Sequence, residues 1–176
     1  FALAADIGTP TAALRDLMRE RNVAQTIVGV DALAVSGIAA DEEALPFADG
    51  SLDLVVSALS LQWVNDLPGT LAQIRRALKA DGLFMAALLG GDTLTELRQS
   101  FAAAEAELEG GVSPRVAPFA DVRELGALLQ RAGLALPVAD VDRLTVRYAS
   151  PFDLMRDLRG MGATNALVER RRIPLK

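Results

Sequence analysis

The sequence contains no cysteine and no histidine among its 176 residues. Without cysteine the chain can form neither a disulfide nor a thiolate metal site. Without histidine it lacks both the commonest general base and the imidazole ligand. These absences exclude Ser-His-Asp, Cys-His and zinc-hydrolase mechanisms, and no metal site is expected.

Positive charge is also scarce, because 18 Lys and Arg stand against 23 Asp and Glu and leave a formal net charge of -5. Broad binding to phosphate backbones needs a basic face, so nucleic acid is not expected as a main partner. No apolar run approaches the roughly 20 residues that span a bilayer, and no basic-then-apolar leader opens the sequence. These features predict a protein of the cytoplasm or an organelle matrix, without a membrane span.

Strand-like and helix-like patterns alternate along the first half of the sequence. Almost uncharged runs predict strands, and apolar residues at helical spacing predict helices. The strands are expected at residues 1–7, 26–31, 52–59 and from 82 onward, with helices at 11–21 and 66–78. Such alternation implies a Rossmann-like, doubly wound α/β fold, in which a mostly parallel sheet of buried strands carries helices on both faces.

The second half is more helical. Helices are expected at residues 94–108, with a capping box of Thr93 and Glu96, at 121–132, and from Ser150 and Pro151 onward. Between the last two, apolar side chains from Leu144 to Tyr148 alternate with polar ones, which predicts a strand at a sheet edge. No long linker interrupts the sequence, so residues 1–176 are expected to form one domain with a helical addition toward the C-terminus.

In open parallel sheets, ligands bind outside the carboxyl ends of the strands. Asp31 stands at such an end, where a carboxylate can bind both hydroxyls of a ribose in NAD or in S-adenosylmethionine; the alternative is a cap on the next helix. Gly8 follows the first strand and would let backbone amides approach a ligand closely. The surrounding "DIGTPTAAL" is a weak match to G-x-G-x-x-G and does not continue as a P-loop.

The stretch "DEEALPFADGSLDLVVS" (41–57) resembles class I S-adenosylmethionine-dependent methyltransferases, and "LKADGLFMAAL" (78–88) resembles the helix, turn and fifth strand of that family. "LSLQWVND" (59–66) and "SPFDLMRDLRGMGATNAL" (150–167) are similar to one branch of it. That branch contains the malonyl-carrier-protein methyltransferases of biotin synthesis and the related complex I assembly factors that hydroxylate an arginine. The resemblance covers almost the whole chain.

The resemblance implies S-adenosylmethionine as cofactor, with Asp41 accepting a hydrogen bond from the adenine amino group. The cofactor-binding residues that it implies are Asp6, Gly8, Asp31, Asp41, Glu42 and Ser57. The candidates that face the substrate are Leu59, Gln62 and Trp63. For Trp63 the alternative is packing against the adjacent helix. No catalytic residue is identified.

Three functions remain open. The first is methyl transfer to a carboxylate or to a carrier- or protein-bound acceptor, an in-line displacement that needs no histidine. The second is hydroxylation of an arginine on a partner by an assembly factor for a respiratory complex. The third is a non-catalytic cofactor-binding module. The expected partner is accordingly a small molecule, a carrier protein or a protein substrate, and the oligomeric state is undetermined.

The sequence departs from the family pattern at three places. Pro10 and Ala12 stand where the usual loop has glycines, which supports the non-catalytic alternative. Asp31 and Asp41 are only ten positions apart, where the family normally fits a helix and a strand. The family's leading helical segment and closing antiparallel strand have no counterpart, so the domain is expected to lack both.

Overall fold

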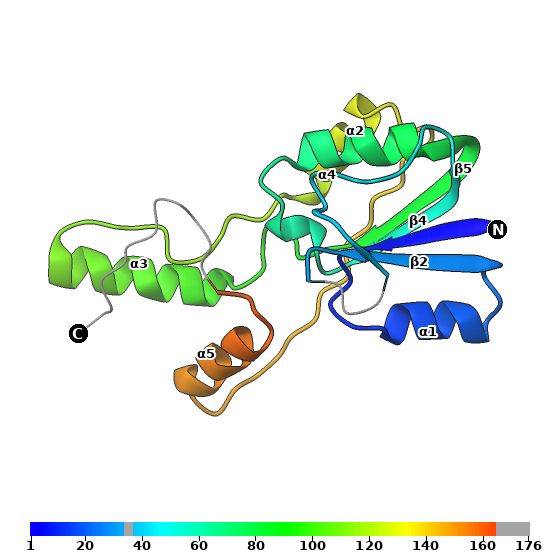
Figure 1. The fold of residues 1–176 in the computed structure, drawn as a ribbon. Coiled ribbons are helices and arrows are strands. Elements are labelled where there is room, and N and C mark those ends of the chain that lie inside the picture. Colours follow the sequence, from blue (N-terminus) through cyan, green and yellow to red (C-terminus); the bar gives the residue numbers. More distant parts are fainter. Residues whose placement is uncertain (34–36, 165–176) are drawn as a thin grey trace. The chain divides into compact units, whose positions relative to one another are not determined.

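The apolar runs of the first half of the chain assemble into one parallel sheet in the computed structural model, which describes residues 1–33 and 37–164 (Figure 1). The strands are β1 (Leu3–Ile7), β2 (Thr26–Asp31), β3 (Ile38–Ala39), β4 (Leu52–Ala58) and β5 (Leu78–Ala87). They lie in the order β3-β2-β1-β4-β5, and every neighbouring pair is parallel. The expected doubly wound α/β architecture is confirmed.

The chain divides into two compact units. Unit 1 comprises Phe1–Gly90 with Ala120–Ala139, and unit 2 comprises Gly91–Phe119 with Asp140–Lys176. Unit 1 holds the sheet with helices α1 (Ala13–Glu20), α2 (Leu67–Ala77) and α4 (Val122–Arg131) and the short helix η1 (Leu61–Trp63). Unit 2 holds α3 (Thr95–Glu109) and α5 (Pro151–Gly160). That these units form a single domain stays a prediction.

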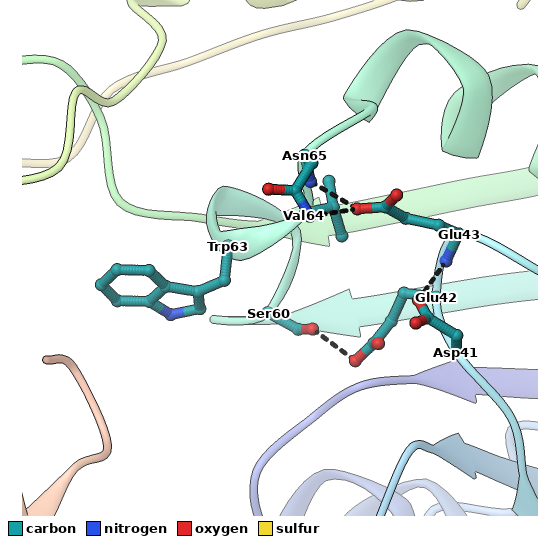
Figure 2. A pocket seen from close by; sticks show the side chains of 7 residues that line it. All are labelled: Asp41, Glu42, Glu43, Ser60, Trp63, Val64 and Asn65. Carbon is teal, nitrogen blue, oxygen red and sulfur yellow. Dashed lines mark hydrogen bonds between the residues drawn. The ribbon is translucent and has the colours of Figure 1, made fainter. Parts of the chain in front are cut away.

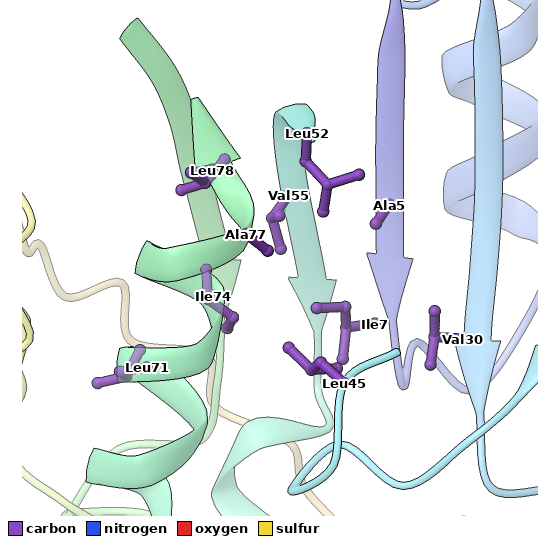
Figure 3. Packing of buried hydrophobic residues seen from close by; sticks show 10 residues of the cluster. All are labelled: Ala5, Ile7, Val30, Leu45, Leu52, Val55, Leu71, Ile74, Ala77 and Leu78. Atoms are coloured by element: carbon purple, nitrogen blue, oxygen red, sulfur yellow. The ribbon is translucent and has the colours of Figure 1, made fainter. Parts of the chain in front are cut away.

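Each face of the sheet carries its own apolar cluster, because successive side chains of a strand point to opposite faces. On one face, Ala5, Ile7 and Val55 pack with Leu71 and Ile74 of α2, as Figure 3 shows, and side chains of α4 cover this cluster. On the other face, Ala4, Leu54 and Val56 pack with Met18 of α1. Helices therefore cover both faces, as the almost uncharged strands predict.

The carboxyl ends of β1 and β4 mark the point where the strand order reverses. From β1 the chain passes through α1 to β2 on one side, and β4 joins β1 on the other side. This topological switch point is where open α/β sheets bind ligands. The turn after β1, which begins at Gly8, and the turn after β4, which begins at Leu59, therefore bound the candidate site.

Strand β5 corrects two expectations. It begins directly at Leu78, where α2 ends, so no separate turn precedes it, and a shift of register follows between Leu52 and Leu54 of β4. It is also mostly exposed, with Leu83 at 43% and Met85 at 58%, although its sequence reads as a buried strand. The reason is its position at the edge of the sheet, where it has a neighbouring strand on one side only.

The connection between β2 and β3 is short. It runs from Ala32 to Gly37, six residues, whereas parallel neighbours are usually joined by a dozen or more. The strand that the family pattern places between Asp31 and Asp41 is present as β3, which pairs with β2 through Val30 and Asp31. This pairing places Asp41 just after β3 and close to the carboxyl edge of the sheet.

Unit 2 confirms the helices but corrects two details. Leu94, at a φ of 57°, precedes α3 without a side-chain cap, so the capping box of Thr93 and Glu96 does not form. The strand expected at Leu144–Tyr148 is also wrong, since the described residues of unit 2 form helices and irregular segments only. An alternating apolar and polar pattern forms a strand only where another strand edge is available for pairing. In this segment Leu144 is instead 87% exposed.

The other two helix starts behave as expected. Asp121 and Glu124 form a reciprocal capping box at α4, and the Ser150 hydroxyl accepts a hydrogen bond from the Asp153 N–H at α5. The motif beginning at Ser150 runs past Thr164, and its last residues lie outside the described residues. None of the helices within 1–33 and 37–164 is long and apolar enough to cross a membrane.

Glu105 of α3 anchors the segment that follows the helix. Its carboxylate is 1% exposed and accepts hydrogen bonds from the Ser113 N–H at 2.7 Å, from the Ser113 hydroxyl and from Arg115 Nε at 2.6 Å. The Ser113 N–H, the Ser113 hydroxyl and then Arg115 favour the charged form and lower the pKa of Glu105 to about 2.

This low pKa predicts a pH dependence. A carboxyl whose pKa falls on folding contributes stability that is complete above its ordinary value of 4.5 and is lost as the pH falls toward about 2. Glu105→Gln should lower the urea midpoint at pH 7 and weaken its decline below pH 4.5. The matched control is Glu107→Gln on the exposed side of α3, which should leave the curve unchanged. Identical pH profiles for the two variants would contradict the anchor.

Candidate functional site

A cavity opens at the carboxyl edge of the sheet, between the segment after β3 and the turn after β4. Figure 2 shows its lining, which consists of Asp41, Glu42, Glu43, Ser60, Trp63, Val64 and Asn65. The cavity measures about 190 Å³, whereas pockets that enclose a whole small ligand are about 300–1,000 Å³. It can therefore receive one ring-sized part of a ligand, with the rest extending outside.

Hydrogen bonds hold the acidic segment in place. The Asp41 carboxylate accepts from the Glu43 N–H at 2.8 Å, and the Glu43 carboxylate accepts from the backbone and side-chain N–H groups of Asn65 (Figure 2). Gln73 of α2 adds a reciprocal pair, because its amide donates to the Glu43 carbonyl and accepts from the Leu45 N–H. These hydrogen bonds fix the loop of Asp41, Glu42 and Glu43 to α2 and to the residues just before it.

Gly8 lies beneath this lining. Its φ is +66°, and a Cβ placed there would lie 2.7 Å from the Ser60 Cβ and still closer to Ser60 Oγ and Glu42 Oε1. The Ser60 hydroxyl donates to Glu42 Oε1 at 3.0 Å, directly over the glycine. The Gly8 N–H itself donates to the Val30 carbonyl at 2.7 Å. The glycine therefore serves close approach of side chains, while its own amide is used within the sheet.

Asp6, at the end of β1, is fully buried. Its carboxylate accepts from the Thr9 hydroxyl and pairs with Arg15 Nη1 at 2.9 Å. Burial raises the pKa of Asp6 above 3.8, while Thr9 and Arg15 act in the opposite direction and the charge of Asp31 adds to the rise. Thr9 also accepts from the Ala58 N–H, so this carboxylate fixes the turn after β1 against the end of β4.

Comparisons with known proteins agree with this geometry. A family model described as a methyltransferase domain matches residues 5–86, which covers the sheet, α1 and α2. Mitochondrial arginine-hydroxylase NDUFAF5 of Rattus norvegicus is 47% identical over 94% of this chain and 51% of its own length. The chain belongs to the class I S-adenosylmethionine-dependent methyltransferase superfamily.

Two further matches illustrate the breadth of the superfamily. Malonyl-[acyl-carrier protein] O-methyltransferase of Laribacter hongkongensis is 47% identical over 77% of this chain and 43% of its own length. The crystal structure of an S-adenosylmethionine-dependent methyltransferase from Mesorhizobium loti superposes with a TM-score of 0.53 at 19% identity, over 74% of this chain and 72% of that one. The second match shows the fold alone. The chain spans about half or less of the length of the two curated relatives.

The methyltransferase fold brings some of the expected cofactor residues together. Asp41 and Glu42 line the cavity, and Glu42 lies over Gly8. Asp31 does not line it; its carboxylate accepts from the Leu33 N–H at 2.6 Å, so its binding of a ribose stays a prediction. Ser57 is 2% exposed and donates to the Ile7 carbonyl at 2.7 Å, so its hydroxyl joins β4 to β1.

The expected substrate-facing residues lie in the turn after β4. Leu59 is 49% exposed and adopts a φ of 57°, a left-handed conformation that a branched side chain rarely takes. The Gln62 amide donates to the Leu59 carbonyl and stabilises this turn. Trp63 is 37% exposed and lines the cavity. The turn thus contributes Trp63 to the lining, although Figure 2 shows its indole directed away from the acidic side chains, and contact of these residues with a substrate stays a prediction.

Four lining residues were not among the predicted cofactor-binding or substrate-facing residues, namely Glu43, Ser60, Val64 and Asn65. Their signal was present, since Glu43 continues the acidic stretch and the others lie within "LSLQWVND". Within residues 1–33 and 37–164, no group of three or more acidic, cysteine or histidine side chains is placed to hold a metal ion.

The lining fits part of the cofactor that the superfamily uses. Carboxylates accept hydrogen bonds, as the amino group of a purine requires, and the cavity is large enough for a ring but not for the whole molecule. Gly8 contributes indirectly, because it leaves room for the Glu42 and Ser60 side chains that line the cavity. The residues present therefore suit the adenosine group of the cofactor. They suit its amino-acid portion less well, because Pro10 and Ala12 replace the glycines of the loop that would wrap that portion.

Proposed function

We propose that this chain forms the cofactor-binding part of an S-adenosylmethionine-dependent methyltransferase that acts on a carboxylate or on a carrier- or protein-bound acceptor. The observation that carries the proposal is the cavity of Asp41 and Glu42 at the switch point of the sheet, beside the Gly8 turn. Asp41 would accept from the adenine amino group, and Asp31 would bind the ribose. We place the protein in the cytoplasm or an organelle matrix.

When bound, the cofactor would supply an electrophilic methyl group on a sulfonium, whose carbon the acceptor would attack in line as the thioether of S-adenosylhomocysteine leaves. The task of the protein is then to orient donor and acceptor and to exclude water. Asp6 and Thr9 would hold the turn between the two central strand ends, while Leu59, Gln62 and Trp63 would face the acceptor. No proton has to be removed when the acceptor is a carboxylate.

A second candidate is modification of an arginine on a partner protein, by analogy with the relative named an arginine-hydroxylase. The charge of the site favours this candidate. Asp41, Glu42 and Glu43 line the cavity together, and the chain carries a net charge of -5. An acidic surface of this kind would attract a guanidinium on a partner protein to the neighbourhood of the site, while Asp41 holds the adenine.

Calorimetry with S-adenosylhomocysteine tests the cofactor site. Wild-type protein should bind, and Asp31→Ala and Asp41→Ala should each weaken binding about 10- to 100-fold, because a hydrogen bond to a charged group contributes about 1.5–3 kcal/mol. The control is Asp49→Ala, since Asp49 is a 78% exposed acid that pairs with Arg76 away from the cavity. Equal affinities for all four proteins would reject both carboxylate assignments.

Transfer from labelled S-adenosylmethionine separates the candidate functions. Label on a carrier-bound carboxylate would support methyl transfer to a carboxylate. Label on an arginine would show instead that the acceptor is an arginine of a partner protein. Binding without any labelled product, together with an added oxygen atom on an arginine of the partner by mass spectrometry, would favour hydroxylation. Binding with neither a labelled product nor an added oxygen atom would favour the non-catalytic cofactor-binding module, and absence of binding would reject the cofactor site.

A further inference from the structure

Strand β2 contains a glycine in its interior, where glycine weakens a strand and commonly marks the close approach of another group. The group at Gly29 is the guanidinium of Arg15, from α1. A Cβ on Gly29 would lie 2.9 Å from Nη1, 3.0 Å from Cζ and 3.2 Å from Nε of that arginine. The planar end of Arg15 therefore lies against the backbone of β2, and a methyl group on Gly29 would displace it.

Arg15 is held there by a buried ion pair. Its Nη1 lies 2.9 Å from Asp6 Oδ2, and the side chains of Arg15 and Asp6 are 14% and 0% exposed. The next arginine on the same helix differs, because Arg19 pairs with Asp16 while the two side chains are 55% and 65% exposed. A charge left unpaired in the interior is costly, whereas exposed pairs contribute little. The two arginines of α1 therefore have different roles.

The contacts continue beyond Asp6 to the other side of the switch point. The second carboxylate oxygen of Asp6 accepts from the Thr9 hydroxyl, and the Thr9 oxygen accepts from the Ala58 N–H at 3.1 Å. A chain of polar contacts thus runs from α1 through the end of β1 and the following turn to the end of β4. The turn that it crosses begins with Gly8, over which Glu42 and Ser60 lie.

We propose that Arg15 is a positioning residue that holds the Gly8–Thr9 turn in its ligand-ready geometry by fixing the Asp6 carboxylate. The effect of Arg15 on ligand binding rests on the proposed function. Pro10 and Ala12 replace the glycines by which such a loop would wrap a ligand, and the turn is instead held from behind by side chains. Gly29 belongs to the same arrangement, because the absence of a Cβ leaves space for the Arg15 guanidinium.

The proposal predicts a loss of affinity that depends on pH. Arg15→Ala should weaken binding of S-adenosylhomocysteine about tenfold or more at pH 8, because an unpaired Asp6 carboxylate disturbs the turn. The charged and titratable groups that face Asp6 are Arg15 from α1 and Asp31 from β2. Without Arg15, the pKa of Asp6 rises further, so the Asp6 carboxyl becomes neutral at a higher pH than in the wild type. The difference in affinity between Arg15→Ala and the wild type should therefore become smaller as the pH is lowered toward 5.

Two other variants separate positioning from a general loss of structure. Gly29→Ala keeps every charge and requires no unusual φ, but its methyl group requires a small shift of the Arg15 guanidinium beside Asp6; the affinity of this variant should fall between wild type and Arg15→Ala. Arg15→Lys should restore part of the affinity, because an ammonium can neutralise Asp6 but lacks the planar fork. Arg19→Ala is the matched control and should bind as wild type does.

Hydrogen exchange without ligand makes the test independent of the proposed function. The Ala58 N–H should exchange faster in Arg15→Ala than in Arg19→Ala, because its acceptor is Thr9. Unchanged exchange at Ala58, with wild-type affinity and pH profile, would overturn the role of Arg15. If wild-type protein does not bind S-adenosylhomocysteine, the cofactor site is wrong, while the exchange rate still decides whether Arg15 holds the turn.

Discussion

Gly8→Ala is expected to destabilise the protein by about 2–5 kcal/mol and to abolish measurable binding of S-adenosylhomocysteine. Two costs combine, since a left-handed conformation costs an L-residue about 1–2 kcal/mol and overpacking adds about 1–3 kcal/mol. The added methyl group would meet Glu42 and Ser60, whose side chains already bond to one another over the glycine. Moving them apart would open the lining of the cavity, so affinity should fall together with stability.

Gly50→Ala is the matched control for this change. Gly50 has a φ of +61°, close to the +66° of Gly8, but nothing lies within 4 Å of a Cβ built on it. It should therefore show only the backbone cost of about 1–2 kcal/mol and retain ligand affinity. Urea unfolding and calorimetry on both variants give the comparison. Equal effects of the two substitutions would show that close approach at Gly8 is unimportant.

Ile74→Ala is expected to cost about 2–5 kcal/mol of unfolding free energy, the range for truncating a buried aliphatic side chain to alanine. Ile74 is completely buried and extends from α2 into the cluster that Figure 3 shows, which includes Leu52 and Val55 of β4. Its loss removes packing between the helix and the strand whose carboxyl end carries the turn with Trp63. A domain has only about 5–15 kcal/mol of stability, so the change is large.

The urea midpoint of unit 1 measures this effect. Val138→Ala supplies the control, because Val138 belongs to the same unit and is 89% exposed; its truncation should change stability by less than about 0.5 kcal/mol. A similar midpoint for the two variants would mean that α2 does not depend on this cluster. Binding should survive in Ile74→Ala wherever the protein remains folded, since Ile74 does not line the cavity.

The elements of the sheet could be predicted because their cause is local. The run at residues 52–59 contains β-branched and apolar residues that favour a strand, and Pro151 after Ser150 favours a helix start; both predictions are confirmed. The run at Leu144–Tyr148 shows the limit of the same argument. Its alternation is as regular as that of a strand, but pairing needs a second edge, and local pattern contains no information about that edge.

The candidate site also contains residues that the sequence predicted and residues that it did not. Asp41, Glu42 and Trp63 were found from a motif, because the segments that carry them are short and distinctive, and they line one cavity. Gly8 was also found, but the expected use of its amide differs from the structure, where the N–H bonds to Val30. Arg15 and Gly29 carried no signal, since an arginine on an amphipathic helix and a glycine in a strand each have many ordinary explanations.

Residue types and their spacing were enough to predict four of the five strands, the helices that follow them, the exclusion of histidine and thiolate chemistry, and the superfamily. Each of these depends on residue type and spacing along the chain. The folded arrangement was needed to show that Asp6 is buried against Arg15, that Glu42 and Ser60 meet over Gly8, and that β5 is an exposed edge. These features depend on which surfaces the folded sheet brings within a few ångströms, and burial and pairing between distant segments are properties of the fold.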